Sequence, residues 1–375
     1  MKRILAISLA LCMLLCGCGT LTDGSYHNVT PHKPNADQAD PESIYAVDYA
    51  GLCSALSNMT RSGTAGGIIY VPRYDQSRIE SEMVLAVART LREDPIAAYA
   101  VEEIQWELGT NSGQSAVAVN ITYVHDRSEI RKIRTVADLE MAKAVIATEL
   151  AACSTGVVLY LKDYEQTDFV QLVEDHADAN PQTVMETPQV KVNIYPEEGE
   201  ARVVELKFNY QTSRDALRNM QNQVSPIFAS AVLYVSGDAQ THEKYSQLYA
   251  LLMERFDYRI ETSITPAYSL LRHGVGDAKA FAVVYAAMCQ EAGLDCRVVS
   301  GTRWGEQWYW NMVLDEGVYY HVDLLRSNEV GAFHEWTDAD MEGYVWDYSA
   351  YPADATMPTE GEEGRPLFEK QGSFF

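Results

Sequence analysis

The sequence predicts an α+β protein in which two similar units precede a third, different α+β domain. Alternating apolar and polar residues mark paired strands in the middle of the chain, for example at residues 117–123 and 204–210. Segments with helical periodicity lie between these strands. Similar segments also recur about 90 residues apart. We therefore expect small sheets covered by helices rather than an all-helical or all-strand fold.

The N-terminus has the parts of a secretory signal. Lys2 and Arg3 precede an apolar run at residues 4–15, and the small Gly17 precedes Cys18. This run is shorter than the ~20 apolar residues that span a bilayer. Residues 15–18, Leu-Cys-Gly-Cys, resemble the lipobox of bacterial lipoproteins. That resemblance implies a signal peptide over residues 1–17, acylation (palmitate) of Cys18, and anchoring to the outer face of the cell membrane.

Two alternatives to this anchor are weaker. Acylation of Cys16 would put the bulky Leu15 where the signal peptidase requires a small side chain. A conventional cleaved signal would leave a free secreted protein. In either case, residues 18–42 contain too few apolar residues to fold and are predicted to form a flexible tether.

The composition argues against several partners and cofactors. The formal net charge of −24 disfavours nucleic acid, because phosphate binding needs clustered Lys and Arg. The sequence has no glycine-rich phosphate loop and no Cys/His spacing typical of zinc, so we expect neither a cofactor nor a metal.

The two similar units are expected at residues 43–155 and 156–240. Each is predicted to have the order strand, helix, strand, strand, helix. In the first unit these elements fall at residues 67–71, 78–92, 104–108, 116–123 and 136–151. In the second unit they fall at residues 156–161, 168–178, 189–195, 202–210 and 213–228.

A different pattern begins at residue 241 and is expected to form one domain to residue 375. Its predicted helices cover residues 245–256 and a longer segment from residue 278 to Ala292, where Gly293 is a helix stop. Its predicted strands are residues 296–301, 310–314 and 318–323, with the turn at 315–317.

Five ordered motifs in this domain resemble the transglutaminase-like, papain-related family. They are Gly-Asp-Ala-Lys-Ala-Phe-Ala at 276–282, Ala-Gly-Leu at 292–294, Val-Ser-Gly at 299–301, Trp-Tyr-Trp-Asn at 308–311 and Tyr-Tyr-His-Val-Asp at 319–323. The resemblance implies a cysteine-protease-like α+β fold over about the last 130 residues. Several motifs in order are more specific than any one of them.

The family's chemistry uses a cysteine at a helix N-terminus, a histidine that takes its proton and an aspartate that orients the histidine. Here the cysteine position falls on Ala278 and the histidine position on Trp308; only the aspartate is present, as Asp323. Ala278 offers no nucleophile, and the Trp308 indole cannot accept a proton. The resemblance therefore implies a pseudoenzyme.

Other residues are poor replacements for the missing groups. Cys289 lies eleven residues beyond Ala278, about three helical turns away, and is expected to be a core thiol. His321 is expected to be structural. Asp277 is predicted to be the helix N-cap, and Lys279 flanks the lost cysteine on its other side.

The altered site is rich in aromatic residues. Trp304, Trp308 and Tyr309 are the candidate ligand-binding residues, suited to peptide side chains or cell-wall glycan. Alternatively, Trp308 only fills the pocket. In both cases Asp323 needs a hydrogen-bond partner, which the Trp308 indole or a tyrosine hydroxyl can supply. Two further interpretations stay open: an active thiol-type peptidase or amidotransferase with displaced catalytic groups, and a rigid cap on the preceding units.

Overall fold

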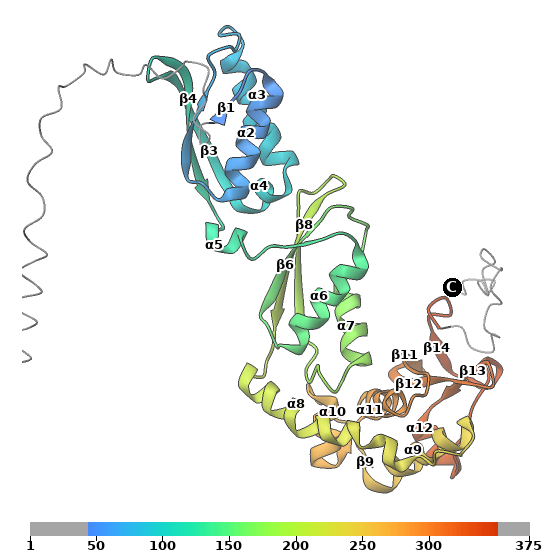
Figure 1. Ribbon diagram of the computed structural model, residues 1–375. Helices are drawn as coiled ribbons and strands as arrows, with labels where there is room; N and C mark the ends of the chain where they lie inside the picture. The colour runs from blue at the N-terminus through green and yellow to red at the C-terminus, as the bar shows by residue number, and fades with distance from the viewer. Residues whose placement is uncertain (1–43, 352–375) are drawn as a thin grey trace, which may run out of the picture. The chain divides into compact units, whose positions relative to one another are not determined.

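The computed structural model describes residues 44–351 (Figure 1). The expected signal peptide, the acylated Cys18, the tether and the acidic tail from Pro358 lie outside the described residues. Within residues 44–351, no helix has the length and apolar character needed to cross a membrane.

The first sheet has β4 at its centre. The elements here are β1 (Ile44–Tyr45), α2 (Tyr49–Ser62), β2 (Gly66–Tyr70), α3 (Ile79–Glu93), α4 (Pro95–Ala100), β3 (Val101–Asn111) and β4 (Gln114–Tyr123). Both β2 and β3 pair with β4 in antiparallel register. Leu52 of α2 and Met83 of α3 are fully buried, as is Val117 of β4. The helices thus cover the apolar face that the alternating pattern predicts.

The second sheet repeats this arrangement and, like the first, has four strands. Its region contains α5 (Arg127–Ile130), β5 (Arg134–Val136), α6 (Leu139–Ala151), β6 (Gly156–Leu161), α7 (Phe169–Ala179), β7 (Gln189–Tyr195) and β8 (Arg202–Asn209). The strand order is β5-β6-β8-β7, with β5 parallel to β6 and the other pairs antiparallel. Figure 1 shows α6 and α7 on one face of this sheet. Ile146 of α6 and Val173 of α7 pack there with Leu159 and Val204.

Two helices pack against other sheets than the predicted order of elements assigned to them. The helix expected to close the first unit, at residues 136–151, places Ala142, Ile146 and Leu150 in the core of the second sheet. The helix expected to close the second unit is α8 (Arg214–Ala229), and its apolar residues join the third core. Each small sheet is instead covered by a helix that precedes its first long strand and one that follows it. A periodic pattern fixes which face of a helix is apolar, but not which sheet covers it.

The third region is built around one buried helix. It contains η1 (Ala231–Tyr234), α9 (Thr241–Arg255), β9 (Asp257–Tyr258), α10 (Pro266–Tyr268), η2 (Ser269–His273), β10 (Val275–Gly276), α11 (Ala278–Glu291), β11 (Cys296–Arg303), β12 (Glu306–Asp315), β13 (Val318–Val322), α12 (Leu324–Val330), η3 (Asp338–Asp340) and β14 (Tyr344–Trp346). Its main sheet has the order β13-β12-β11-β14, and all its pairs are antiparallel. α11 is buried along most of its length and packs on β11 and β12.

Two predicted chain reversals in this region are confirmed. The turn after β12 has Glu316 at φ 48° and Gly317 at φ 82°, the left-handed conformation of a tight hairpin. Gly293, at φ 75°, follows the end of α11. These reversals bring the two long strands back against the helix.

Hydrogen bonds attach α11 to its surroundings. The Tyr285 hydroxyl donates to the Tyr245 carbonyl (3.0 Å), and the Tyr245 hydroxyl donates to the Asp295 carbonyl (2.7 Å). From the sheet, the Asn311 amide donates to the Ala282 carbonyl (2.9 Å). These bonds fix the helix start relative to β12, since satisfied buried polar groups tolerate little displacement.

The different burial of two leucines in the first unit predicts that replacing them will change stability by different amounts. Leu52→Ala in α2 removes a side chain with 0% exposure, whereas Leu85→Ala in α3 removes one with 58% exposure. We expect Leu52→Ala to lower the free energy of unfolding by about 2–5 kcal/mol and Leu85→Ala to change it by less than about 0.5 kcal/mol. Urea denaturation followed by circular dichroism measures both. Equal effects would contradict the core assignment.

Candidate functional site

The N-terminus of α11 has the geometry of a catalytic helix start without the nucleophile. The predicted N-cap is confirmed: the Asp277 carboxylate accepts a hydrogen bond from the Ala280 amide at 2.9 Å. Burial raises the pKa of Asp277. Ala278 is the first helical residue and is 6% exposed. A cysteine here would benefit from the helix dipole, but the methyl group of Ala278 has no atom that could attack a substrate.

Trp308 donates a hydrogen bond to Asp323. Its Nε1 lies 2.8 Å from Asp323 Oδ2, and the Tyr344 hydroxyl donates to the same oxygen at 2.7 Å. The second oxygen, Oδ1, accepts from the amides of Leu325 (3.0 Å) and Arg326 (3.1 Å) at the start of α12. Both partners that the sequence suggested, an indole and a tyrosine hydroxyl, are therefore present. Asp323 is 1% exposed, and these four bonds satisfy it.

The surroundings keep Tyr344 protonated. Burial, followed by the charge of Asp323, raises the pKa of the Tyr344 hydroxyl well above its usual value. The guanidinium of Arg303 lies over the rings of Trp308 (5.3 Å) and Tyr344 (5.6 Å) and covers both donors. The result is a closed network around a carboxylate, with donors that cannot act as bases.

Little free space lies between Ala278 and Asp323. Ala278 and Asp323 line the same small cavity, together with residues of α11, β12 and α12. Its free volume admits no water-sized molecule. The structure thus brings the Ala278 and Asp323 positions together, with Trp308 hydrogen-bonded to Asp323.

His321 is held away from a catalytic role. It is 0% exposed, and its Nδ1 accepts a hydrogen bond from the Trp310 indole at 2.9 Å. Its Nε2 therefore carries the proton and lies 2.8 Å from an Asp338 carboxylate oxygen. Both ring nitrogens are occupied within a buried aromatic cluster, as the structural interpretation of His321 expects.

Lys279 does not replace the missing nucleophile. Its ammonium lies 2.6 Å from an Asp178 carboxylate oxygen and 5.0 Å from the centre of the Tyr309 ring. Burial alone would lower the pKa of Lys279, but the Asp178 charge more than offsets it, and the pKa is raised. A lysine that stays protonated cannot attack a carbonyl.

The cysteines of the described residues are free thiols, and three of them are inaccessible. Cys153, Cys289 and Cys296 are buried, whereas Cys53 is partly exposed. Burial raises the pKa of Cys153, and it raises that of Cys296 well above its usual value. Reactive thiols need the opposite environment, namely exposure and a stabilised thiolate.

Trp304 is separated from the other aromatic candidates. It lies at the tip of the β11–β12 hairpin with φ 54° and is 69% exposed. Its ring packs against Gly343, where an added Cβ would lie 2.6 Å from the indole. Trp304 lines neither of the two cavities described here. Closeness in sequence therefore does not bring Trp304 and Tyr309 into one site.

Tyr309 faces a larger groove, of about 1040 Å³. α7, the start of β7, α11 and β11 form its walls, and Tyr351 also lines it. Its charged residues are mostly acidic: Glu174, Asp175, Asp178 and Asp347, against Lys279 and Arg297. The groove combines excess negative charge with two tyrosines. Sequence inspection missed it because most of its walls come from residues 170–190 and 279–309, two segments about 90 residues apart in the sequence.

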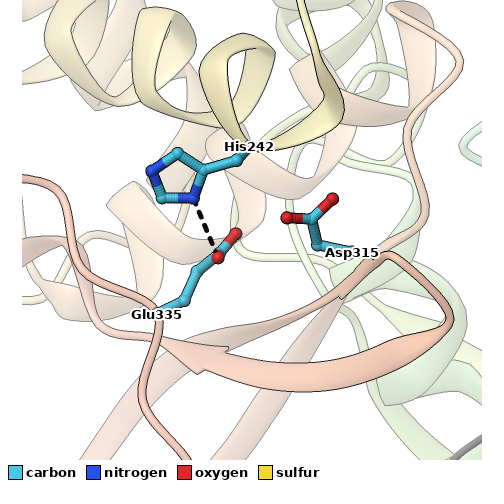
Figure 2. Close-up of side chains that lie close together, drawn as sticks. All are labelled: His242, Asp315 and Glu335. Carbon is cyan, nitrogen blue, oxygen red and sulfur yellow. Dashed lines mark hydrogen bonds and ion pairs between the residues drawn. The ribbon is translucent and has the colours of Figure 1, made fainter.

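A second polar cluster lies at another edge of the same domain (Figure 2). His242 of α9, Asp315 at the end of β12 and Glu335 offer ligand atoms that all lie within 4.8 Å of one another. His242 Nδ1 is 2.9 Å from Glu335 Oε2. These are the residues among 44–351 whose side-chain types and spacing could hold a metal ion. No short motif joins positions 242, 315 and 335, so sequence inspection did not indicate this cluster.

Comparison with known families identifies the third region. Residues 230–348 match the transglutaminase-like superfamily. The chain therefore contains a transglutaminase-like domain, and the resemblance that the motifs predicted is confirmed at this level. No curated protein matches the chain at a significant level.

Solved structures give weaker similarity. They include a proposed protease from Parabacteroides distasonis (9% identity, TM-score 0.23, covering 59% of this chain and 35% of that one). A TGase has 9% identity and a TM-score of 0.25, covering 55% of this chain and 61% of that one. A proposed cysteine protease from Cytophaga hutchinsonii has 10% identity and a TM-score of 0.24, covering 42% of this chain and 70% of that one. The chain spans about a third of the first of these structures and under two thirds of the second, and we base no argument on these TM-scores.

The hydrogen bond to Asp323 predicts a cost for removing the Trp308 indole N–H. Trp308→Phe keeps an aromatic ring but leaves Asp323 with one donor fewer. We expect the free energy of unfolding to fall by about 1–3 kcal/mol, because a hydrogen bond to a charged group contributes about that much. Trp304→Phe at the 69% exposed position should change it by less than about 0.5 kcal/mol. A Trp308→Phe protein as stable as the native one in urea denaturation would contradict this role.

Thiol burial predicts selective alkylation. In the native ectodomain from Gly19 onward, iodoacetamide at neutral pH should modify Cys53, whereas Cys153, Cys289 and Cys296 should react only after unfolding. Peptide mass spectrometry with and without denaturant measures this. Rapid native labelling of Cys289 or Cys296 would instead favour a displaced catalytic thiol.

Proposed function

We propose that this protein is a lipoprotein, anchored through Cys18 to the outer face of a bacterial membrane, whose transglutaminase-like domain binds a ligand without catalysis. The observation that carries the second part is the hydrogen bond from Trp308 Nε1 to Asp323 Oδ2. In the family's mechanism that carboxylate orients the histidine. Here the Trp308 indole, which cannot accept a proton, donates a hydrogen bond to the Asp323 carboxylate. Ala278 provides no nucleophile.

The groove beside Tyr309 is the ligand site that we favour. Its tyrosines offer flat apolar surfaces, and its acidic side chains favour cations. The Lys279 charge is already paired with Asp178, so it does not cancel the remaining acidic groups. We propose that the ligand is a peptide with free amino groups, a class that includes cell-wall peptides. The two sheet units that precede the domain are interpreted as copies of one α+β module that hold it away from the membrane.

A structural role is the second candidate, and one observation favours it. In the sequence, Cys153 and Met185 lie next to strands of the second sheet. Their side chains nevertheless belong to the same apolar core as α9 and α11. A domain that shares its core with a neighbouring unit can act as a rigid cap. In that case mutations around Trp308 would lower stability and leave no binding to lose.

Activity assays on the ectodomain test the absence of catalysis. We expect the native protein to show neither amine incorporation into glutamine substrates nor hydrolysis of cell-wall peptides, because Ala278 and Trp308 supply no nucleophile and no base. The Ala278→Cys/Trp308→His double mutant runs alongside it, and activity gained there would confirm the alignment. Turnover by the native protein would instead favour the alternative function, a thiol-type peptidase or amidotransferase with displaced catalytic groups.

Calorimetric titration tests the binding site. A synthetic cell-wall stem peptide with a free side-chain amine should bind the ectodomain, and its N-acetylated form should bind at least tenfold more weakly. Tyr309→Ala should abolish binding, while Trp304→Ala, outside the groove, should leave it unchanged. Equal binding of the acetylated peptide would contradict the role of the acidic groups. No binding of either peptide would favour the rigid cap.

A further inference from the structure

Three potential metal ligands converge far from the triad-equivalent positions. Asp315 ends β12, seven residues along the strand from Trp308. At about 3.3 Å per residue, that separation is about 23 Å. His242 comes from the first turn of α9, and Glu335 from the segment between α12 and η3 (Figure 2). The cluster is therefore independent of the site already described.

We propose that His242, Asp315 and Glu335 bind a zinc ion, with water completing the coordination. One imidazole and two carboxylates are a ligand set that Zn²⁺ accepts, with bonds of about 2.0–2.2 Å. An open fourth position is normal where three protein ligands are present. Ca²⁺ and Mg²⁺ prefer sites made only of oxygen, so the imidazole disfavours both.

The geometry is close to that of a bound site. In a tetrahedral zinc site with such bonds, ligand atoms lie about 3.4 Å apart. Here the three ligand atoms lie within 4.8 Å of one another, and His242 Nδ1 is 2.9 Å from Glu335 Oε2. Asp315 ends β12 and directly precedes the hairpin turn at Glu316 and Gly317.

The charge balance favours a cation. Within the part of the chain that the structure describes, no Lys or Arg forms an ion pair with the carboxylate of Asp315 or Glu335. Glu335 Oε1 is buried and has no hydrogen-bond partner there. A divalent ion would satisfy the unpaired oxygen and offset both negative charges.

Two of the three ligands are held in place by their neighbours. The His242 ring packs on Phe333 at 5.3 Å between centroids, and Phe333 also contacts Tyr249 in α9. Glu335 precedes Trp336, whose backbone exchanges two hydrogen bonds of 2.8 Å with His321. Ordered neighbours of this kind reduce the entropy lost when a metal binds. A bound ion would join α9, β12 and the segment before η3.

Calorimetric titration of Zn²⁺ into the metal-free ectodomain tests this site. We expect one ion per chain and a rise in the melting temperature, since a ligand that binds only the folded state stabilises it. Co²⁺ should give visible absorption bands of low-symmetry N/O coordination. Ca²⁺ and Mg²⁺ at the same concentration should neither bind nor compete.

Single variants decide whether these three side chains form the site. His242→Ala, Asp315→Asn and Glu335→Gln should each weaken Zn²⁺ binding at least about tenfold. His334→Ala is the matched control: it removes an exposed histidine next to Glu335 and should leave affinity unchanged. His242 is 54% exposed, so its replacement should preserve the fold, which circular dichroism checks.

Two results would overturn the zinc site. The first is no Zn²⁺ binding by the native ectodomain. The second is equal affinity in native, His242→Ala and Glu335→Gln proteins, which would mean that the ion binds elsewhere. Both are independent of the peptide titrations, because the cluster shares no residue with the Tyr309 groove.

Discussion

The hydrogen bonding of the buried Asp323 carboxylate is the constraint on which the transglutaminase-like domain depends. Its two oxygens accept from the Trp308 indole, the Tyr344 hydroxyl and two amides at the start of α12. These donors come from β12, β14 and α12, so one carboxylate connects three elements. A buried charge without such partners would cost several kcal/mol, and the network cannot lose a member cheaply.

This constraint is met without a histidine, because Trp308 and Tyr344 both donate to the buried carboxylate. A histidine at position 308 would give Asp323 an N–H donor and also take a proton from the nucleophile. The tryptophan at this position supplies the N–H donor but cannot accept a proton. Ala278 at the start of α11 then fits a space too small for water.

Two other surfaces of the domain carry charged and polar groups. The groove beside Tyr309 is open, aromatic and acidic, and it is lined by α7 as well as by α11 and β11. The His242 cluster lies at the other end of β12. Both depend on segments far apart in sequence, because each of these surfaces forms only when helices pack on sheets. The second sheet region thus helps to form the groove through the packing of α7 and the start of β7.

The sequence by itself determined the α+β class, the hairpins, the N-cap at Asp277 and the transglutaminase-like character of the third region, because these follow from local periodicity, capping chemistry and ordered motifs. It also suggested both kinds of donor to Asp323. The tertiary structure decided that residues 136–151 pack on the second sheet, that Trp304 is separate from Tyr309, and that His242 meets Asp315 and Glu335. Local patterns fix which face of an element is apolar or polar, but only the packing of the whole chain fixes what that face meets.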